Sequence, residues 1–249
     1  MRYIGIIPSR YGSTRLHAKA LRPLCGKEMF WHVYTRASKC PLFTEVYLAT
    51  DDERIANVAE RYDIPYIMTS TEHTSGTDRV YEAVQSLAVD EETIIANIQG
   101  DEPLLHPEML SELLSPFAED NSVNVSTLCT DIDEKDIYEP SRVKVIMDKY
   151  NNALYFSRSV IPYKRGVTPF EYRVHIGLYA FRYRALQQFV TWEPCALECV
   201  ESLEQLRFLY NGVPIHVVYT KHKVHSVDEE EDIAIVERIL EQEKDIYHY

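Results

Sequence analysis

Short apolar runs alternate with amphipathic stretches through the first half of the chain. The apolar runs are residues 3–8, 46–49, 66–68 and 93–98. Between them, apolar residues recur every three or four positions, which is typical of helices with one buried face. Strands that alternate with helices in this way form parallel sheets covered on both faces. The sequence therefore predicts an α/β fold with a mixed, mostly parallel central sheet.

Polar loops follow three of the predicted strands. They are residues 9–19, 50–53 and 99–103. In parallel α/β sheets, ligands bind beyond the carboxyl ends of the strands. We therefore expect the functional site in these loops.

The second half of the chain has a different pattern, with more strands and fewer helices. Strands are predicted at residues 123–130, 143–147, 153–156, 176–181 and 215–219. One helix is predicted from apolar residues at every third position, which are Leu197, Val200, Leu203, Leu206 and Leu209. Asn211-Gly212 would end that helix as a C-cap, and a last helix would begin at about Asp228. We expect mixed or antiparallel pairing in a small β-rich subdomain, within a single domain of residues 1–249.

Composition excludes several classes of protein. The 26 Lys and Arg against 39 Asp and Glu give a net charge of −13, which argues against broad binding to nucleic acid. The apolar runs are too short for a membrane-spanning helix, so no membrane insertion is expected. The five cysteines are an odd number without a Cys-x-x-Cys pair, which favours reduced thiols. With no secretory signal apparent, we expect a cytoplasmic protein.

The N-terminal segment has a charge opposite to that of the whole chain. Residues 1–27 contain six Lys and Arg and no Asp or Glu. The loop after the first strand carries Arg10, Arg15 and Lys19 together with Ser13 and Thr14, but lacks the glycine spacing of a Walker A or G-x-G-x-x-G motif. A solvated basic face is one interpretation. A site for a polyphosphate is the other, because positive charges and backbone donors together bind phosphates.

A series of motifs resembles the cytidylyltransferases that activate 3-deoxy-manno-octulosonate (Kdo). The first is Ile7-Pro8-Ser9-Arg10-Tyr11-Gly12-Ser13-Thr14-Arg15-Leu16-x-x-Lys19. In chain order the others are Thr50-Asp51-Asp52, Ser75-Gly76-Thr77-Asp78-Arg79, Gln99-Gly100-Asp101-Glu102-Pro103, Ala153-Leu154-Tyr155-Phe156-Ser157-Arg158, His175-Ile176-Gly177-Leu178-Tyr179, Leu203-Glu204-Gln205-Leu206-Arg207 and Val227-Asp228. They cover nearly the whole chain.

The resemblance implies a fold and a reaction. The fold is a nucleotide-diphospho-sugar transferase-like sandwich, with residues 1–120 or so binding nucleotide and about 121–249 binding sugar and forming a homodimer. In the reaction, the anomeric hydroxyl of Kdo attacks the α-phosphate of CTP, and CMP-Kdo for lipopolysaccharide synthesis and pyrophosphate are formed. Positioning of the anions and neutralisation of their charge would provide the catalysis.

The resemblance also implies the nucleotide and metal residues. Those expected to bind CTP are Arg10, Ser13, Arg15, Lys19, Ser75, Thr77 and Arg79, of which Lys19 is also catalytic. For Ser75 to Asp78, a turn with a helix cap is the alternative interpretation. Asp101 and Asp228 are expected to be catalytic and to share a Mg²⁺ ion, a cation that carboxylate and phosphate oxygens suit. Glu102 is interpreted as a neighbouring surface charge.

The expected sugar-binding residues have polar side chains that suit a keto-acid sugar. They are Gln99, Arg158, His175, Tyr179, Glu204 and Gln205. The planar guanidinium of Arg158 would bind the carboxylate at two points, and the other side chains would bind hydroxyl groups.

Two departures from the family pattern leave alternatives open. Ala18 stands where the family has glycine, so either the backbone there tolerates a Cβ atom or the Lys19 loop shifts. Glu229-Glu230 replaces a Thr-Pro pair after Asp228.

Three alternative functions are considered. The first is a cytidylyltransferase for 8-amino-Kdo or sialic acid, and the second is a CTP-binding protein with little turnover. The third is a glycosyltransferase, but the Asp-x-Asp motif that this class requires is missing.

Overall fold

The computed structural model describes residues 1–12, 16–73 and 75–247. It divides into two compact units, and the boundary falls within helix α4 (Pro107–Glu119). Unit 1 comprises Met1–Ser111 and Val224–Tyr249, and unit 2 comprises Glu112–Lys223. The last segment of the chain thus groups with the N-terminal segment, whereas the division inferred from the sequence placed it in the second half.

Unit 1 is built on a parallel sheet. Its strands are β1 (Tyr3–Ser9), β4 (Glu45–Thr50), β5 (Tyr66–Met68) and β6 (Ile94–Asn97), in the spatial order β6-β1-β4-β5. The connecting helices are α1 (Met29–Ala37), α2 (Glu53–Arg61) and α3 (Gly76–Gln85). β6 is wholly buried, as expected for a strand covered on both faces. The predicted alternation of strands and helices is confirmed in this unit.

Side-chain caps begin two of these helices. Asp52 accepts a hydrogen bond from the backbone N–H of Arg54 at the start of α2, and Ser75 accepts one from Asp78 at the start of α3. Each cap satisfies a backbone donor that the helix itself leaves unpaired. The N-cap predicted at residues 50–52 is confirmed, and so is the helix cap considered for Ser75.

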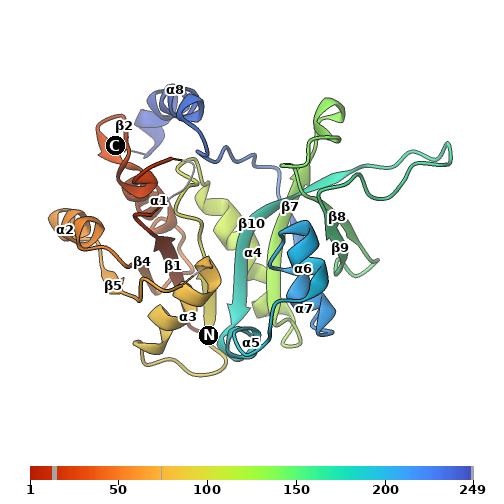
Figure 1. Ribbon diagram of the computed structural model, residues 1–249, viewed down its shortest axis with the longest axis horizontal. Coiled ribbons are helices and arrows are strands. Elements are labelled where there is room, and N and C mark those ends of the chain that lie inside the picture. The colour runs from red at the N-terminus through yellow and green to blue at the C-terminus, as the bar shows by residue number, and fades with distance from the viewer. Residues whose placement is uncertain (13–15, 74, 248–249) are drawn as a thin grey trace. The chain divides into compact units, whose positions relative to one another are not determined.

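The C-terminal helix α8 (Glu230–Tyr247) packs within unit 1. It lies beside the short strand β2 (Pro23–Leu24), which pairs with β3 (Lys27–Glu28), and Figure 1 shows it, in blue, close to β2 and α1. The buried side chains of this cluster are Leu16, Leu24, Met29, Leu104, Val227, Val236 and Leu240. Buried Arg36 of α1 also forms an ion pair with Glu243 of α8. These contacts tie the end of the chain to its beginning.

Unit 2 has mixed strand pairing, as predicted. Its strands are β7 (Val125–Asp131), β8 (Lys144–Met147), β9 (Ala153–Ser157), β10 (Arg173–Arg182) and β11 (His216–Tyr219). β10 pairs antiparallel with β7 and β8, β8 pairs antiparallel with β9, and β11 runs parallel to β7. A short 3₁₀ helix, η2 (Glu134–Asp136), follows β7, and α5 (Tyr183–Phe189) follows β10.

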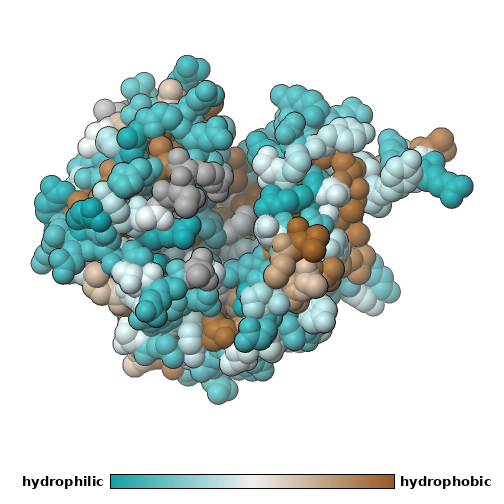
Figure 2. All heavy atoms as spheres, in the orientation of Figure 1, coloured by the Kyte–Doolittle hydropathy of each residue, from teal (hydrophilic) through white to brown (hydrophobic). Residues whose placement is uncertain are grey.

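The single helix predicted across Leu197–Leu209 is wrong. The structure has two short helices, α6 (Ala196–Glu201) and α7 (Leu206–Tyr210), and α6 ends at Ser202, whose backbone lies in the left-handed region (φ 51°). A repeat of three residues drifts around a helix with 3.6 residues per turn, so it cannot keep one face buried. Leu197 and Val200 are exposed, and Figure 2 shows hydrophobic side chains on the surface over α6 and α7. The predicted helix end at Asn211-Gly212 is confirmed for α7, with Asn211 as the C-cap and Gly212 following it at φ 75°.

Within the described part of the chain, no helix combines the length and the apolar character needed to cross a membrane.

The backbone at Ala18 adopts a conformation that favours glycine. Ala18 precedes the short helix η1 (Lys19–Leu21) and has φ 52° and ψ 35°, in the left-handed region. A Cβ atom there comes too close to the following carbonyl oxygen, which costs about 1–2 kcal/mol. The backbone therefore accepts the Cβ atom, but under strain.

Ala18→Gly should stabilise the protein. Relief of the strain is partly offset by the extra freedom of glycine in the unfolded chain, so we expect a gain of about 0.5–1 kcal/mol in the free energy of unfolding. Urea unfolding followed by circular dichroism measures it. The matched control is Gly212→Ala, which places a Cβ atom at φ 75° and should lower stability. An Ala18→Gly protein no more stable than the parent would contradict the assignment of strain.

Candidate functional site

The carboxyl ends of β1 and β6 approach each other closely at Gly100. A Cβ atom on Gly100 would lie 2.8 Å from the carbonyl oxygen of Pro8 and 2.9 Å from Oγ of Ser9. Both distances are shorter than normal contacts, so the close approach requires glycine. The loop that carries Asp101 is therefore held against the end of the strand that leads into the basic loop.

Lys19 lies between Asp101 and Asp228. Its Nζ atom is 2.6 Å from Oδ2 of Asp101 and 3.1 Å from Oδ1 of Asp228. The Lys19 side chain is only 12% exposed, whereas those of Asp101 and Asp228 are 33% and 40% exposed. Three residues from distant motifs thus form one charge cluster with an opening to solvent. Their catalytic and metal-binding roles stay predictions.

Two hydrogen bonds join the segments that carry these aspartates. The backbone N–H of Val227 donates to the carbonyl oxygen of Asp101 at 3.1 Å. Oγ of Ser226 donates to Oε1 of Glu102 at 2.6 Å. Residues 226–228 therefore run alongside residues 101–102, with Val227 fully buried.

The interpretation of Glu102 as a surface charge is wrong. Glu102 is only 6% exposed. Burial, and then the neighbouring Asp101 carboxylate, raise the pKa of Glu102 to about 8. The sequence missed this residue because its partner Ser226 is 124 positions away, and no local pattern links the two.

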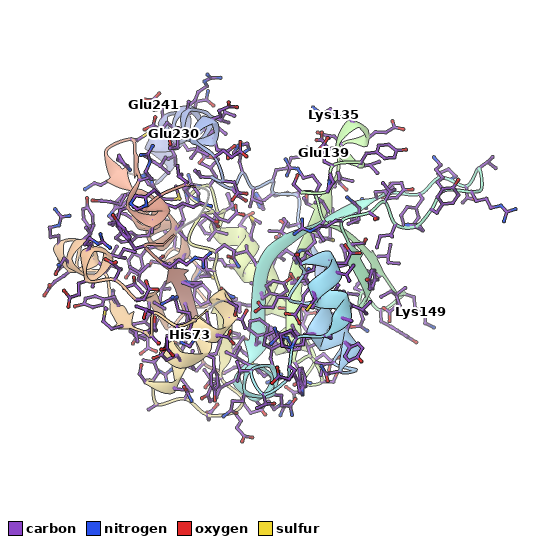
Figure 3. All side chains as sticks on the ribbon, in the orientation of Figure 1. His73, Lys135, Glu139, Lys149, Glu230 and Glu241 are labelled. Atoms are coloured by element: carbon purple, nitrogen blue, oxygen red, sulfur yellow. The ribbon has the colours of Figure 1, made fainter. Side chains whose placement is uncertain are left out.

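Asp232 holds the backbone around Asp228. Its Oδ2 atom accepts hydrogen bonds from the backbone N–H groups of Asp228 and Glu229, at 2.8 and 2.9 Å. Its Oδ1 atom lies 3.2 Å from Nε2 of His225. α8 itself begins at Glu230, labelled in Figure 3, two residues later than predicted. The carboxylate of Asp232 therefore orders the turn into this helix.

The basic loop is described only in part. Ser13 and Arg15, as well as Thr14, lie outside the described residues. Arg10 is exposed directly after β1. The loop starts at the carboxyl end of β1, where a site was expected, and ends at Lys19, the first residue of η1.

The residues expected at the nucleotide side of α3 have structural contacts. Arg79 is 3% exposed, and its guanidinium donates to Oδ2 of Asp51 at 2.7 Å and to Oγ1 of Thr69 at 2.5 Å. Thr77 is buried within α3, and Ser75 caps that helix. Arg79 thus ties α3 to the end of β4. The binding of nucleotide by these three residues stays a prediction.

In unit 2, an irregularity in β10 brings His175 and Tyr179 together. The pairing with β7 shifts between Ile176 and Tyr179, so that residues are left over on β10, as in a β-bulge. The hydroxyl of Thr127 fills the irregularity, 2.9 Å from Nε2 of His175 and 2.7 Å from the carbonyl oxygen of Leu178. The sequence missed Thr127, because β7 also carries Ser126 and Thr130 and nothing in the pattern sets Thr127 apart from them.

Desolvation keeps the ring of His175 neutral. The ring lies 4.9 Å from that of Phe156 and 5.4 Å from that of Tyr179, measured between centroids. Although the residue keeps partial exposure, the loss of water around its ring lowers the pKa of His175 to about 3. Burial, and then Glu204, raise the pKa of Tyr179 well above its usual value. Both side chains are therefore neutral at physiological pH.

The hydroxyl of Tyr179 and Nε2 of Gln205 are among the buried polar atoms of unit 2 that lack hydrogen-bond partners within the described residues. An unpaired polar atom that is shielded from water costs free energy, which a polar ligand could recover. Gln205 follows Glu204 in the segment between α6 and α7.

Arg158 and Gln99 lie in different units. The guanidinium of Arg158 donates to the carbonyl oxygens of Glu201, Pro140 and Ser202, which occupy three of its five N–H groups. Its predicted contact with a sugar carboxylate would have to use the others. Gln99, in unit 1, follows β6 and is half-buried. The sugar-binding roles of both residues stay predictions.

Comparisons with known proteins identify the family. Residues 4–233 match the family described as cytidylyltransferase. The 3-deoxy-manno-octulosonate cytidylyltransferase of Oleidesulfovibrio alaskensis is 50% identical over 239 residues, 96% of each chain. The protein of the same name from Lawsonia intracellularis is 50% identical over 241 residues, 96% of this chain and 94% of that one. The chain belongs to the 3-deoxy-manno-octulosonate cytidylyltransferase family.

The fold of this chain is similar to that of two solved structures. A CMP:2-keto-3-deoxy-manno-octonic acid synthetase complexed with CTP has a TM-score of 0.94 and 38% identity, over 98% of this chain and 100% of that chain. A 4-diphosphocytidyl-2C-methyl-D-erythritol synthase from Anaerococcus prevotii, with a TM-score of 0.62 and 14% identity, shares the fold alone. The predicted nucleotide-diphospho-sugar transferase-like fold and the nucleotidyltransferase class are confirmed.

Lys19→Met should change how this family member responds to divalent cations. Without such cations, loss of the ammonium group leaves two carboxylates facing each other, and we expect a loss of about 1 kcal/mol because both are partly solvated. Added Mg²⁺ should raise the melting temperature of the variant more than that of the parent, because it replaces the lost positive charge. Calorimetry with chelator and with Mg²⁺ measures both effects.

Lys135→Met is the matched control for that experiment, because Lys135 is an exposed lysine of unit 2 (Figure 3). It should leave the melting temperature and the response to Mg²⁺ unchanged. Equal responses of the Lys19 variant and the parent would contradict the charge balance described here.

The stability of the protein should depend on pH through His175. Its pKa is about 3 in the folded state, against 6.5 ordinarily, so below pH 6.5 the unfolded chain takes up a proton that the folded chain refuses. Stability is therefore lost as the pH falls. Between pH 7 and pH 5 the parent should lose about 1–2 kcal/mol more than His175→Gln, after allowance for solvent screening. Denaturant unfolding at several pH values tests this, and parallel curves for the two proteins would refute it.

Proposed function

We propose that the protein transfers CMP from CTP to the anomeric hydroxyl of Kdo, giving CMP-Kdo and pyrophosphate. The observation that carries the proposal is the convergence of Lys19, Asp101 and Asp228 in unit 1. The names of the relatives, and the CTP in the structure of one of them, support the choice of substrates.

The carboxylates of Asp101 and Asp228 fit a divalent cation, for which we propose Mg²⁺. Both approach the same positive group, the ammonium of Lys19, and this geometry supports the proposal that they share a cation. Carboxylate oxygens are preferred ligands of Mg²⁺, which completes its shell with water and phosphate oxygens. When bound, the ion would neutralise charge on the triphosphate and on the departing pyrophosphate.

The basic residues of unit 1 have the complementary role of binding phosphate. Arg10 is exposed at the carboxyl end of β1, and Arg15 and Ser13 are expected to bind the triphosphate from the same loop. Once the carboxylates have another cation, the ammonium of Lys19 is available to bind a phosphate oxygen. The hydroxyl of Kdo then forms a bond to the α-phosphorus of CTP, the bond to pyrophosphate breaks, and the hydroxyl proton is released.

Unit 2 is proposed to bind the sugar. His175 and Tyr179 are neutral, and the hydroxyl of Tyr179 and Nε2 of Gln205 are buried and in need of partners. Such groups suit the hydroxyls of a sugar, with Glu204 as a further candidate in unit 2 and Arg158 directed to the carboxylate, and Gln99 is the candidate of unit 1. We also propose a cytoplasmic homodimer that supplies CMP-Kdo for lipopolysaccharide synthesis, as the resemblance implies.

A pyrophosphate-release assay tests the proposal. With CTP, Mg²⁺ and Kdo we expect turnover, and lower rates with UTP or with sialic acid, while 8-amino-Kdo tests the choice of eight-carbon sugar. Asp101→Asn and Asp228→Asn should each lower kcat/KM by about 100-fold or more, because removal of one ligand weakens both cation binding and charge neutralisation. Asp133→Asn, an exposed aspartate of unit 2, should have no effect.

CTP binding without pyrophosphate release, for any of these sugars, would refute a transferase and leave the CTP-binding alternative. Full turnover by Asp101→Asn at limiting Mg²⁺ would refute the proposed cation site.

A further inference from the structure

Glu102 and Ser226 form a contact that the proposed chemistry does not use. Their hydrogen bond is 2.6 Å long, and Glu102 is almost fully buried. The second carboxyl oxygen, Oε2, has no hydrogen-bond partner among the described residues. A buried carboxyl group is costly to maintain, so its contact with Ser226 calls for an explanation beyond packing.

The contact joins the two segments that end in the aspartates. Glu102 directly follows Asp101, and Ser226 lies two residues before Asp228. Besides this contact, the backbone hydrogen bond from Val227 to Asp101 also joins the segments. One hydrogen bond alone lets the segments pivot about it. A second, beside it, fixes their relative orientation as well as their separation.

The rest of the turn is already fixed on its other side. Asp232 holds the backbone N–H groups of Asp228 and Glu229, and the side chain of Val227 is buried against unit 1. The Ser226–Glu102 contact is therefore a direct side-chain hydrogen bond between the Asp101 and Asp228 segments, in addition to the bridge that Lys19 forms between the two carboxylates.

We propose that Glu102 and Ser226 are positioning residues that set the spacing of the Asp101 and Asp228 carboxylates, and thereby favour Mg²⁺ over Ca²⁺. The proposal rests on the cation site of the proposed function. Mg²⁺ requires near-octahedral ligands at 2.0–2.1 Å, whereas Ca²⁺ accepts 2.3–2.6 Å and irregular geometry. A looser pair of carboxylates therefore penalises Mg²⁺ more than Ca²⁺.

Metal titration of the full-length, nucleotide-free protein tests this. Isothermal titration calorimetry gives the affinities for Mg²⁺ and Ca²⁺ separately. Ser226→Ala removes the donor, and we expect Mg²⁺ binding to weaken about tenfold and Ca²⁺ binding by less than about threefold. Ser226→Thr keeps a hydroxyl donor and should retain the ratio of the two affinities. If Ser226→Ala only disrupted the structure and Ser226 had no positioning role, the affinities for Mg²⁺ and Ca²⁺ would fall equally.

The matched control is Ser86→Ala. Ser86 also donates one hydrogen bond of similar length, 2.7 Å to the carbonyl oxygen of Ala83, but at the end of α3. It should leave both affinities unchanged. Should Ser226→Ala fail to fold, Glu102→Gln provides the test, because it keeps an oxygen acceptor for Ser226 at the same position. We expect its ratio of affinities to stay within about threefold of the parent.

The outcomes separate this proposal from the proposed function. An unchanged Mg²⁺ affinity in Asp101→Asn would refute the cation site, and both proposals with it. Loss of Mg²⁺ binding in Asp101→Asn, with the parental ratio of affinities in Ser226→Ala, would refute only the positioning pair. A tenfold shift of that ratio in Glu102→Gln would also refute it, because the effect of Glu102 would then not come from accepting the hydrogen bond of Ser226.

Discussion

The candidate site of unit 1 depends on one interaction, in which the ammonium group of Lys19 lies between the carboxylates of Asp101 and Asp228. Asp101 and Asp228 repel each other, and they remain close only because Lys19 compensates their charge and the backbone around them is fixed. Gly100 allows the first carboxylate to approach the end of β1, and burial of Val227 anchors the second. The packing of the C-terminal segment against the rest of unit 1 is thus required for the site as well as for the core.

The sequence predicted the fold where the determinants are local and periodic. The apolar runs that became β1, β4 and β6, and the cap at Asp52, follow from residue types within a few positions. The segment Leu197–Leu209 failed for a physical reason: its repeat matched neither a helix nor a strand, and the left-handed backbone at Ser202 depends on tertiary contacts. The grouping of α8 with unit 1 also depends on packing between distant segments, which periodicity does not contain.

The candidate site likewise contains residues that the sequence identified and residues that it missed. The motifs identified Lys19, Asp101 and Asp228 because each carries chemistry that the resemblance names, and the structure brings the three together. Glu102 was missed since its environment is created by Ser226, far away in the chain. For Arg79 the resemblance implied a nucleotide contact, which stays a prediction, and the structure adds that Asp51 and Thr69 bind its guanidinium. Residue type predicts which chemistry is available, whereas the partners within the fold decide how it is used.

The two units present different kinds of recognition to a ligand. Unit 1 offers full charges, which bind any polyphosphate of suitable shape and discriminate little between sugars. Unit 2 also offers neutral groups, because desolvation keeps the His175 ring unprotonated and the Tyr179 hydroxyl protonated. A site with buried, unpaired hydrogen-bonding atoms rejects a ligand that lacks the matching group, since those atoms then stay unsatisfied. If unit 2 binds the sugar as proposed, buried groups such as the Tyr179 hydroxyl and Nε2 of Gln205 would discriminate between Kdo and related keto acids, whereas the charge cluster of unit 1 would not.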